Sequence, residues 1–278
     1  QVICNRGTLT IKDSSSNHTG VISNTNQGAY PCTRTVKNVG TLVIEGGTIR
    51  SEGAVALLNS ADCTIKGENT VLEATKEGHT GGWDNATAAI ENRNSGELII
   101  ENAVVRSSSE SAIFCDSMAA SFEVYDGTFQ GNENYGAFNG SASTKRGIVY
   151  GGQWSSDPSL ILAEKHYVEK DGDWYVVKEM TTTDITVSTE EELLATLDAI
   201  SDADAVNITI AGDITLDTSA KLPKGSTIEI IEESSLTIGE NAVLTQDGTI
   251  VNNGTLTVDG FLTTPLNLQN NGVITDLP

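Results

Sequence analysis

A short phrase recurs along the first half of this chain and constrains its fold more than any other feature. The phrase is an apolar pair, an Asn or Asp, a short turn, and a segment in which apolar and polar residues alternate. Its copies begin at Ile3-Cys4-Asn5, Val36-Lys37-Asn38, Leu57-Leu58-Asn59, Ile90-Glu91-Asn92, Phe114-Cys115-Asp116 and, more loosely, Phe138-Asn139. Six copies predict a repeat architecture in which each copy builds the same structural unit.

The alternating segments define a column of equivalent apolar residues. These residues are Ile11, Ile44, Ile65, Ile100, Val124 and Val149, at intervals of 33, 21, 35, 24 and 25 residues. In several copies a second apolar residue follows five positions later, as Ile49 follows Ile44 and Trp154 follows Val149. A constant phrase with variable inserts is typical of a solenoid, because each turn returns to the same position while its loops grow outward. The period of two residues indicates strands, so we predict an all-β coil of stacked strands.

The polar residue of the phrase has a structural interpretation. Asn and Asp tolerate the left-handed backbone that tight corners require, and stacked amides can hydrogen-bond from one turn of a coil to the next. An ordinary turn-forming role is an equally simple interpretation. The predicted Asn/Asp ladder consists of Asn5, Asn38, Asn59, Asn92 and Asp116.

The repeated phrases also resemble a known family. Residues 38–49 (Asn-Val-Gly-Thr-Leu-Val-Ile-Glu-Gly-Gly-Thr-Ile) and 253–260 (Asn-Gly-Thr-Leu-Thr-Val-Asp-Gly) are similar to right-handed parallel β-helix, pectin-lyase-like surface proteins of Gram-positive gut bacteria. The stretch from Gly151-Gly152-Gln153-Trp154 to Trp174-Tyr175-Val176-Val177 is the most specific part of this resemblance. The resemblance implies a right-handed parallel β-helix and an exported, adhesin-like, cell-surface protein.

The pattern divides the chain into two modules. Residues 1–180 are predicted to form the parallel β-helix, with a hairpin cap over about 158–180 around Asp171-Gly172. Residues 181–278 are predicted to form a second, smaller β-solenoid-like module. Ser188 and Glu191 form a capping-box pair before an apolar face, which predicts one helix over about 189–200. A small β-sandwich is the main alternative for this second half.

Charge and motifs limit the chemistry. With 16 Lys and Arg against 38 Asp and Glu, the net charge of −22 argues against a nucleic-acid partner, and no apolar run is long enough to enter a membrane. The paired-carboxylate and Gly-His-Gly motifs of β-helical hydrolases are missing, since Gly78-His79-Thr80 lacks the second Gly. A lyase-like cluster could still form from separate turns, although solvated surface is the more common outcome. Its candidate members are Glu97, Glu101, Glu123 and Arg106. We therefore predict a protein that is not an enzyme and has no cofactor or metal.

The longest insert gives the best candidate binding site. Sugars are held by an aromatic face together with Asp or Asn side chains, and Trp83, Asp84 and Asn85 supply these groups on a glycine-rich loop. Alternatively, Trp83 folds back to cover the coil. The predicted glycan-binding residues are Trp83, Asp84, Asn85, His79, Tyr30 and Tyr135.

The cysteines indicate neither a zinc site nor a clear disulfide framework. Cys63 is predicted to point into the core, and Cys4 and Cys115 to point outward. Cys32 lies in an insert from which it could reach Cys4, but the sequence does not show the required geometry.

Three functions remain open at this stage. The leading prediction is an extracellular, cell-surface module, part of a larger exported protein, whose loops bind a host or dietary glycan or a surface protein. A divergent polysaccharide lyase or hydrolase and a purely structural stalk are the alternatives. The first residues form strand and turn without an initial Met, which is why we interpret the chain as a piece of a longer polypeptide.

Overall fold

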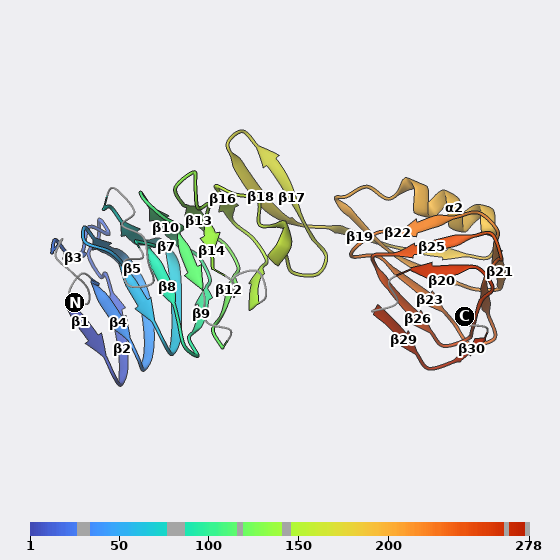
Figure 1. The fold of residues 1–278 in the computed structure, drawn as a ribbon, viewed down its shortest axis with the longest axis horizontal. Coiled ribbons are helices and arrows are strands. Elements are labelled where there is room, and N and C mark those ends of the chain that lie inside the picture. The colour runs from blue at the N-terminus through green and yellow to red at the C-terminus, as the bar shows by residue number, and fades with distance from the viewer. Residues whose placement is uncertain (27–33, 77–86, 116–118, 141–145, 264–266, 276–278) are drawn as a thin grey trace. The chain divides into compact units, whose positions relative to one another are not determined.

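The computed structural model describes the chain outside residues 27–33, 77–86, 116–118, 141–145, 264–266 and 276–278 (Figure 1). The chain forms two compact units. Unit 1 comprises Gln1–Ala163 and Val168–Lys178, and unit 2 comprises Glu164–Tyr167 and Glu179–Pro278. Both units are all-β apart from short helices, and their repeated strands pair in parallel, which is consistent with a β-solenoid.

Sheet A of unit 1 contains one short strand from each copy of the phrase. The strands follow one another in sequence order, each paired in parallel with the next. They are β1 (Ile3–Asn5), β4 (Val36–Asn38), β6 (Leu57–Asn59), β8 (Ile90–Asn92), β11 (Ile113–Cys115) and β14 (Phe138–Asn139).

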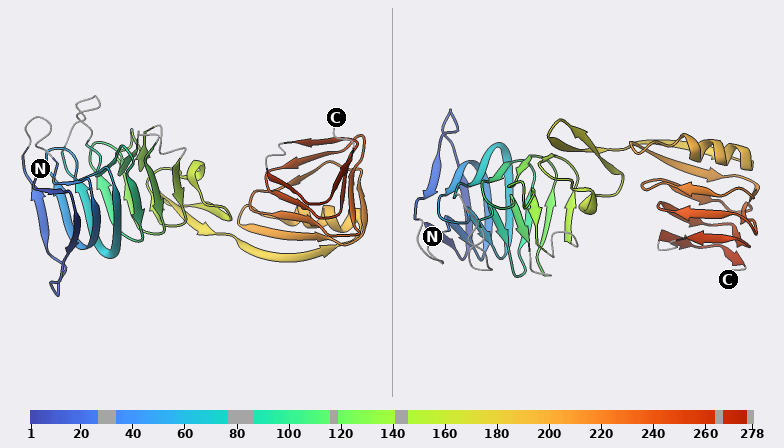
Figure 2. Two further views of the ribbon diagram at one scale, coloured as in Figure 1. Left: turned by 90° about the horizontal axis from the view of Figure 1, so that it is seen from below. Right: turned by 45° about the horizontal axis from the view of Figure 1, so that its top comes forward.

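Sheet B contains the alternating segments and has two columns of strands. In the first column the chain continues directly from sheet A, and in the second it continues past a corner. The first column contains β2 (Thr8–Lys12), the first halves of β5 (Thr41–Ser51) and β7 (Asp62–Ala74), β9 (Glu97–Ile100), β12 (Ser121–Val124) and β15 (Gly147–Val149). The second contains β3 (Val21–Asn24), the second halves of β5 and β7, β10 (Val104–Ser107), β13 (Thr128–Gln130) and β16 (Gln153–Trp154). We call each pass of the chain through these columns a rung; the rungs of unit 1 lie side by side in Figure 2, from the blue strands to the green ones.

The predicted apolar column is confirmed. Register partners link Ile11 to Ile44, Ile44 to Ile65, Ile65 to Ile100, Ile100 to Val124, and Val124 to Val149. The second column is likewise in register, from Ile22 through Ile49, Leu72, Val105 and Phe129 to Trp154. Alternation places these side chains in one buried cluster, because successive residues of a strand point to opposite faces. Ile11 and Ile22, in the first rung, are only partly buried.

The last rung of unit 1 is covered by its own chain. After the 3-10 turn η1 (Ser159–Ile161), Leu162 pairs with Val149, and Ala163 N donates to Val149 O at 2.9 Å. Strands β17 (His166–Asp171) and β18 (Trp174–Glu179) are neighbours in sheet B, and β18 pairs antiparallel with β16. Covering these edges satisfies backbone groups that would otherwise be unpaired. The hairpin therefore lies where the Asp171-Gly172 turn predicts a cap.

Unit 2 has three parallel sheets. Sheet C contains β19 (Thr181–Val187), β20 (Asp204–Ile210), β23 (Thr227–Ile230), β26 (Thr249–Asn252) and β29 (Leu268–Asn270). Sheet D contains β21 (Asp213–Leu216), β24 (Ser235–Ile238), β27 (Thr255–Val258) and β30 (Val273–Thr275), and sheet E contains β22 (Ala220–Leu222), β25 (Val243–Gln246) and β28 (Phe261–Thr263). All pairings among these described strands are parallel, unlike those of an antiparallel β-sandwich.

The helix of unit 2 packs on its core. Helix α2 (Glu190–Ala199) buries Leu193 and Leu197, close to the predicted span of about 189–200. The predicted cap is wrong by one residue: Thr189, not Ser188, accepts the capping hydrogen bond from Glu192 N, and Glu192 Oε2 accepts from Ser188 N at 2.8 Å. Three consecutive Glu residues made the alternatives indistinguishable by spacing alone.

Candidate functional site

Most of the predicted glycan-binding residues lie outside the described part of the chain. These are Trp83, Asp84, Asn85, His79 and Tyr30. Cys32 and the ladder residue Asp116 also lie outside the described part. Tyr135 is half-buried in a turn in which its backbone N donates to Asn132 O at 3.0 Å. The Trp83 loop therefore stays a prediction.

The Asn ladder is confirmed over four rungs. Asn5 Nδ2 donates to Asn38 Oδ1 at 2.8 Å, Asn38 Nδ2 to Asn59 Oδ1 at 2.8 Å, and Asn59 Nδ2 to Asn92 Oδ1 at 2.9 Å. All four amides are buried. The ladder therefore satisfies buried polar groups at the corner of each rung, and its role is structural.

The fifth ladder position was predicted wrongly. Ile113 pairs with Ile90 and Cys115 pairs with Asn92, so Cys115 occupies the ladder position instead of Asp116. Phe114 pairs with Glu91 and therefore occupies the outward position between them, although its apolar character had suggested an inward one. Cys115 is consequently buried, not outward as predicted.

The candidate lyase-like cluster does not assemble around Arg106. Its guanidinium bonds the buried carboxylate of Glu73, with Nε to Oε2 at 2.8 Å, and Arg50 on the other neighbouring strand pairs with the same carboxylate. Burial raises the pKa of Glu73, but the hydrogen bonds from Arg50 and Arg106 outweigh it and hold the pKa below its usual value. Glu97, Glu101 and Glu123 instead lie in the first column of sheet B or directly after it. Arg106 is thus part of an ion-pair stack across three strands.

A second buried carboxylate lies on sheet A. Glu91 is 2% exposed and faces the guanidinium groups of Arg93 and Arg34, the latter at 4.0 Å. Burial raises the pKa of Glu91 to about 7, opposed by Arg93 and Arg34 and assisted by the negative charge of Glu110. Glu110 is also buried and accepts from Thr87 N at 2.8 Å. This cluster links residues from separate rungs, and its main carboxylate titrates near neutrality.

Because the folded pKa of Glu91 is raised, unit 1 should become more stable as the pH falls. Between about pH 7 and its usual value near 4.5, the folded chain binds a proton that the unfolded chain does not. Lowering the pH from 8 to 5.5 should therefore add about 2 kcal/mol to the free energy of unfolding through this group. Urea unfolding of wild type and Glu91→Gln at both pH values measures this change in the free energy of unfolding. Equal pH dependence of the two proteins would contradict the assignment.

A row of polar and aromatic side chains lies along one corner of the coil of unit 1. Directly after each inward Ile or Val of the first column comes one residue that points outward. These six residues, which we call the corner row, are Lys12, Glu45, Lys66, Glu101, Tyr125 and Tyr150. Neighbouring strands are about 4.8 Å apart, so the row presents its groups at a regular spacing across six rungs.

The first four residues of the corner row carry alternating charges. Glu45 pairs with Lys12 at 3.5 Å and with Lys66 at 3.0 Å. Hydrogen bonding to Lys66 lowers the pKa of Glu45, and the same bond raises the pKa of Lys66. These four side chains line an open cleft of about 560 Å³, together with Asp13, His18, Gly46, Gly67, Glu68 and Asn69.

The last two residues of the corner row form an aromatic pair. The rings of Tyr125 and Tyr150 are stacked with centroids 4.7 Å apart and planes 4° from parallel. Tyr125 is 46% exposed, and its Oη donates to Glu123 Oε2 at 3.0 Å. Ile99 and Ile148, both partly exposed, flank Glu123 in the adjacent outward row. Charged, aromatic and apolar groups thus follow one another along one corner.

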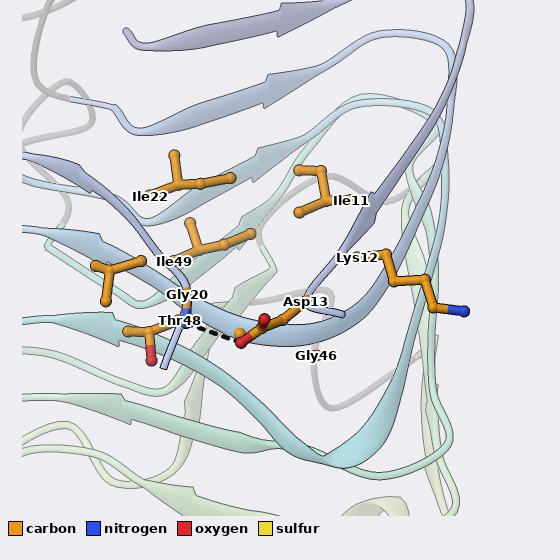
Figure 3. Close-up of a pocket in the computed structure, with 10 residues that line it drawn as sticks. Ile11, Lys12, Asp13, Gly20, Ile22, Gly46, Thr48 and Ile49 are labelled. Carbon is orange, nitrogen blue, oxygen red and sulfur yellow. Dashed lines mark hydrogen bonds between the residues drawn. The ribbon is translucent and has the colours of Figure 1, made fainter. Parts of the chain in front are cut away.

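A smaller cavity of about 240 Å³ lies at the first rung (Figure 3). Ile11, Ile22 and Ile49 line its apolar side, and Asp13 lies at its rim, where its carboxylate accepts from Gly20 N at 2.8 Å. The cavity is therefore the start of the core column, which the 13–20 segment only partly covers. Its Asp13 is already used in holding that segment.

The other features that the sequence suggested indicate no further site among the described residues. Burial raises the pKa of the Cys63 thiol to about 12, as expected for a core residue. Within the described ranges no three His, Cys, Asp or Glu side chains lie where they could hold a metal ion. None of the helices described has the length and apolar character needed to cross a membrane. The chain matches no protein-family model, and a comparison with curated proteins found no match.

Sequence reasoning missed the corner row. Its signal is present, since each member directly follows an inward residue of the predicted column. The residues differ in type from rung to rung, however, so no repeated residue type identifies them.

Proposed function

We propose that this chain is a non-enzymatic, cell-surface module in which a right-handed parallel β-helix binds an extended polysaccharide along the corner row. The observation that carries the proposal is the alignment of six outward-pointing polar and aromatic side chains on successive rungs beside an open cleft. Lys12, Glu101 and Tyr125 are exposed, and the other three are half-buried. An extended polymer repeats its groups along its length, as does this row. The export and the adhesin-like role rest on the resemblance of the repeated phrases.

The connections support a right-handed coil. Parallel strands joined by crossovers in one sheet are right-handed in nearly all known cases, because the twist of the strands favours that path. Successive strands of sheet A are parallel and joined through sheet B, so a right-handed coil is the expected form.

The charges favour a neutral polysaccharide. Both lysines of the corner row face Glu45, and the chain as a whole carries −22, so a polyanionic glycan would be repelled. Carboxylates and lysines can hydrogen-bond sugar hydroxyls, and the exposed surface of Tyr125 can contact sugar C–H groups. Both kinds of group lie within one row.

The test is binding to soluble polysaccharides. We expect wild type to bind at least one of xyloglucan, mixed-linkage β-glucan and galactomannan in affinity electrophoresis or calorimetry, and not polygalacturonate. Tyr125→Ala should weaken binding about tenfold, equivalent to about 1.4 kcal/mol of lost aromatic contact. Tyr167→Ala, a half-buried Tyr of β17 outside both the row and the predicted loop site, is the matched control.

Two results would contradict the proposal: no binding to any of the neutral polymers, or equal affinity of wild type and Tyr125→Ala. Loss of binding in Trp83→Ala with full binding in Tyr125→Ala would assign the site to the predicted loop instead. Release of reducing sugar from a bound polymer would show that the module is an enzyme.

A further inference from the structure

Unit 2 has a cavity of its own, with a volume of about 260 Å³. It lies where sheet E turns into sheet C, so the turn between β22 and β23 and the turn between β25 and β26 both contribute to it. The segment Glu164–Tyr167, which belongs to unit 2, supplies Glu164 and Lys165. Most ligand pockets have about 300–1,000 Å³, so this cavity suits a molecule of one sugar's size better than a length of polymer.

The cavity gathers the positive charge of unit 2. Lys165, Lys221 and Lys224 are the only lysines in the sequence of this unit, which has no arginine and many Asp and Glu residues. Lys165 and Lys224 line the cavity, and Lys221 pairs with Asp247, another lining residue, at 2.8 Å. In an acidic module, lysines collected at one place create a local positive potential. Such a potential favours the binding of an anion.

The two lysines of the lining have no carboxylate bound to them. Within the described ranges neither Lys165 nor Lys224 forms an ion pair, and the carboxylate of Asp247 is already bound by Lys221. Glu164, the other acidic residue of the lining, is exposed to water. Two cations that share a cavity repel each other, and an anion between them offsets this repulsion. The cavity is therefore suited to one negative charge.

Three backbone segments fix the points from which these lysines extend. Lys165 has a left-handed φ of 56°, which is uncommon for a lysine, and its carbonyl oxygen accepts from Met180 N at 2.8 Å. An added Cβ at Gly225 would lie 3.6 Å from Lys165 Cα, so the turn that carries Lys224 packs directly on this segment. At Gly248, in the next turn, an added Cβ would lie 2.3 and 2.6 Å from two carbonyl oxygens of the Lys224 turn. The cavity is thus bounded by closely packed backbone.

A second side of the cavity presents hydroxyl groups. Thr227 and Thr249 are register partners on β23 and β26, and both are half-buried in outward positions of sheet C. Neither hydroxyl has a hydrogen-bond partner among the residues that the structure describes. A hydroxyl can both donate and accept, which suits the hydroxyl groups of a ligand. No described residue of the lining is aromatic, so recognition depends on charge and hydrogen bonds.

We propose that this cavity, which we call the lysine pocket, binds a sugar acid: a molecule of one sugar's size with one carboxylate and several hydroxyl groups. The carboxylate lies between Lys165 and Lys224, and the hydroxyl groups contact Thr227 and Thr249. A doubly charged anion such as phosphate fits less well, because the nearby carboxylate of Glu164 repels a second negative charge. The lysine pocket shares no residue with the corner row, so the two proposals stand or fall separately.

The first test compares gluconate with sorbitol, which has an alcohol in place of the carboxylate. In NMR titrations of the full chain, gluconate should shift the amide signals of Gly225 and Gly248 with a Kd on the order of 1 mM, and sorbitol should not. Lys224→Gln should weaken gluconate binding at least about tenfold. Its melting temperature should not change, because Lys224 is exposed and has no ion pair to lose. Lys37→Gln, which removes the same charge from β4 of unit 1, is the matched control.

The second test separates the hydroxyl contacts from the charge. Thr227→Val should weaken gluconate binding severalfold, because it removes one hydroxyl and keeps a residue that suits a strand. Acetate has the carboxylate without the hydroxyl groups, so it should bind wild type and Thr227→Val equally. The proposal would be overturned by the absence of any shift with gluconate, by equal shifts with sorbitol, by tighter binding of inorganic phosphate, or by full gluconate binding in Lys224→Gln.

Discussion

Replacing Trp154 with Ala should lower the free energy of unfolding of unit 1 by about 4 kcal/mol. Trp154 is fully buried, stacks on Phe129 with centroids 4.2 Å apart, and meets Phe138 edge-on at 6.2 Å. Its Nε1 also donates to Gly151 O at 3.1 Å. The substitution would leave a large cavity beneath the hairpin cap, where the last rung cannot collapse without losing its pairing with β18.

Urea unfolding followed by circular dichroism measures this effect. Trp174→Ala is the matched control, because Trp174 is only half-buried in the hairpin. The control should cost about 1–2 kcal/mol, in proportion to the smaller apolar area that Trp174 removes from water. A loss below about 1 kcal/mol for Trp154→Ala would mean that the core column does not extend to the last rung.

Replacing Asn59 with Ala should cost about 3 kcal/mol. Asn59 lies in the middle of the ladder, accepts from Asn38 and donates to Asn92, and is fully buried. Its removal leaves the oxygen of Asn92 without its amide donor and takes one acceptor from the nitrogen of Asn38. Buried polar groups left without partners cost more than the net value of the hydrogen bonds themselves.

The matched control is Asn69→Ala, since Asn69 is exposed in the cleft. It should change stability by less than about 0.5 kcal/mol. Similar losses in both variants would contradict a stabilising ladder and would favour the simpler interpretation of Asn as a turn former.

The strand columns could be predicted from the sequence because their signal is local. Each inward residue, such as Ile44 or Ile100, lies in an alternating segment, and the fixed phrase before it sets the position of the segment on its rung. Burial of one face then fixes the register, since a shift of one residue would turn the apolar side chains outward. The same logic located the helix of unit 2, whose apolar face is confirmed at Leu193 and Leu197.

Contacts between different rungs could not be predicted in the same way. Arg50 and Arg106, the partners of Glu73, and Arg34, which faces Glu91, come from segments separated by inserts of different lengths, so no spacing along the chain indicates them. The prediction of the fifth ladder residue was wrong because the phrase there contains an extra apolar residue, Phe114, in an outward position, which places Cys115 opposite Asn92. The sequence shows which residues alternate. Which polar residue lies next to a given one on the following rung depends on the register of the two strands, and a shift of one residue changes it.

The most direct test of the account is a distance across the whole stack of unit 1. Thr10 and Ile148 are outward residues of the first and last rungs of unit 1. They are linked through the register partners Val43, Thr64, Ile99 and Glu123. Five strand spacings of about 4.8 Å place them about 24 Å apart. Spin labels at these positions, in a chain whose Cys4 and Cys32 are replaced by Ser, report this distance by double electron–electron resonance. A single narrow distribution near about 24 Å is the predicted result, and a broad distribution or one centred beyond about 35 Å would contradict parallel stacking in this register.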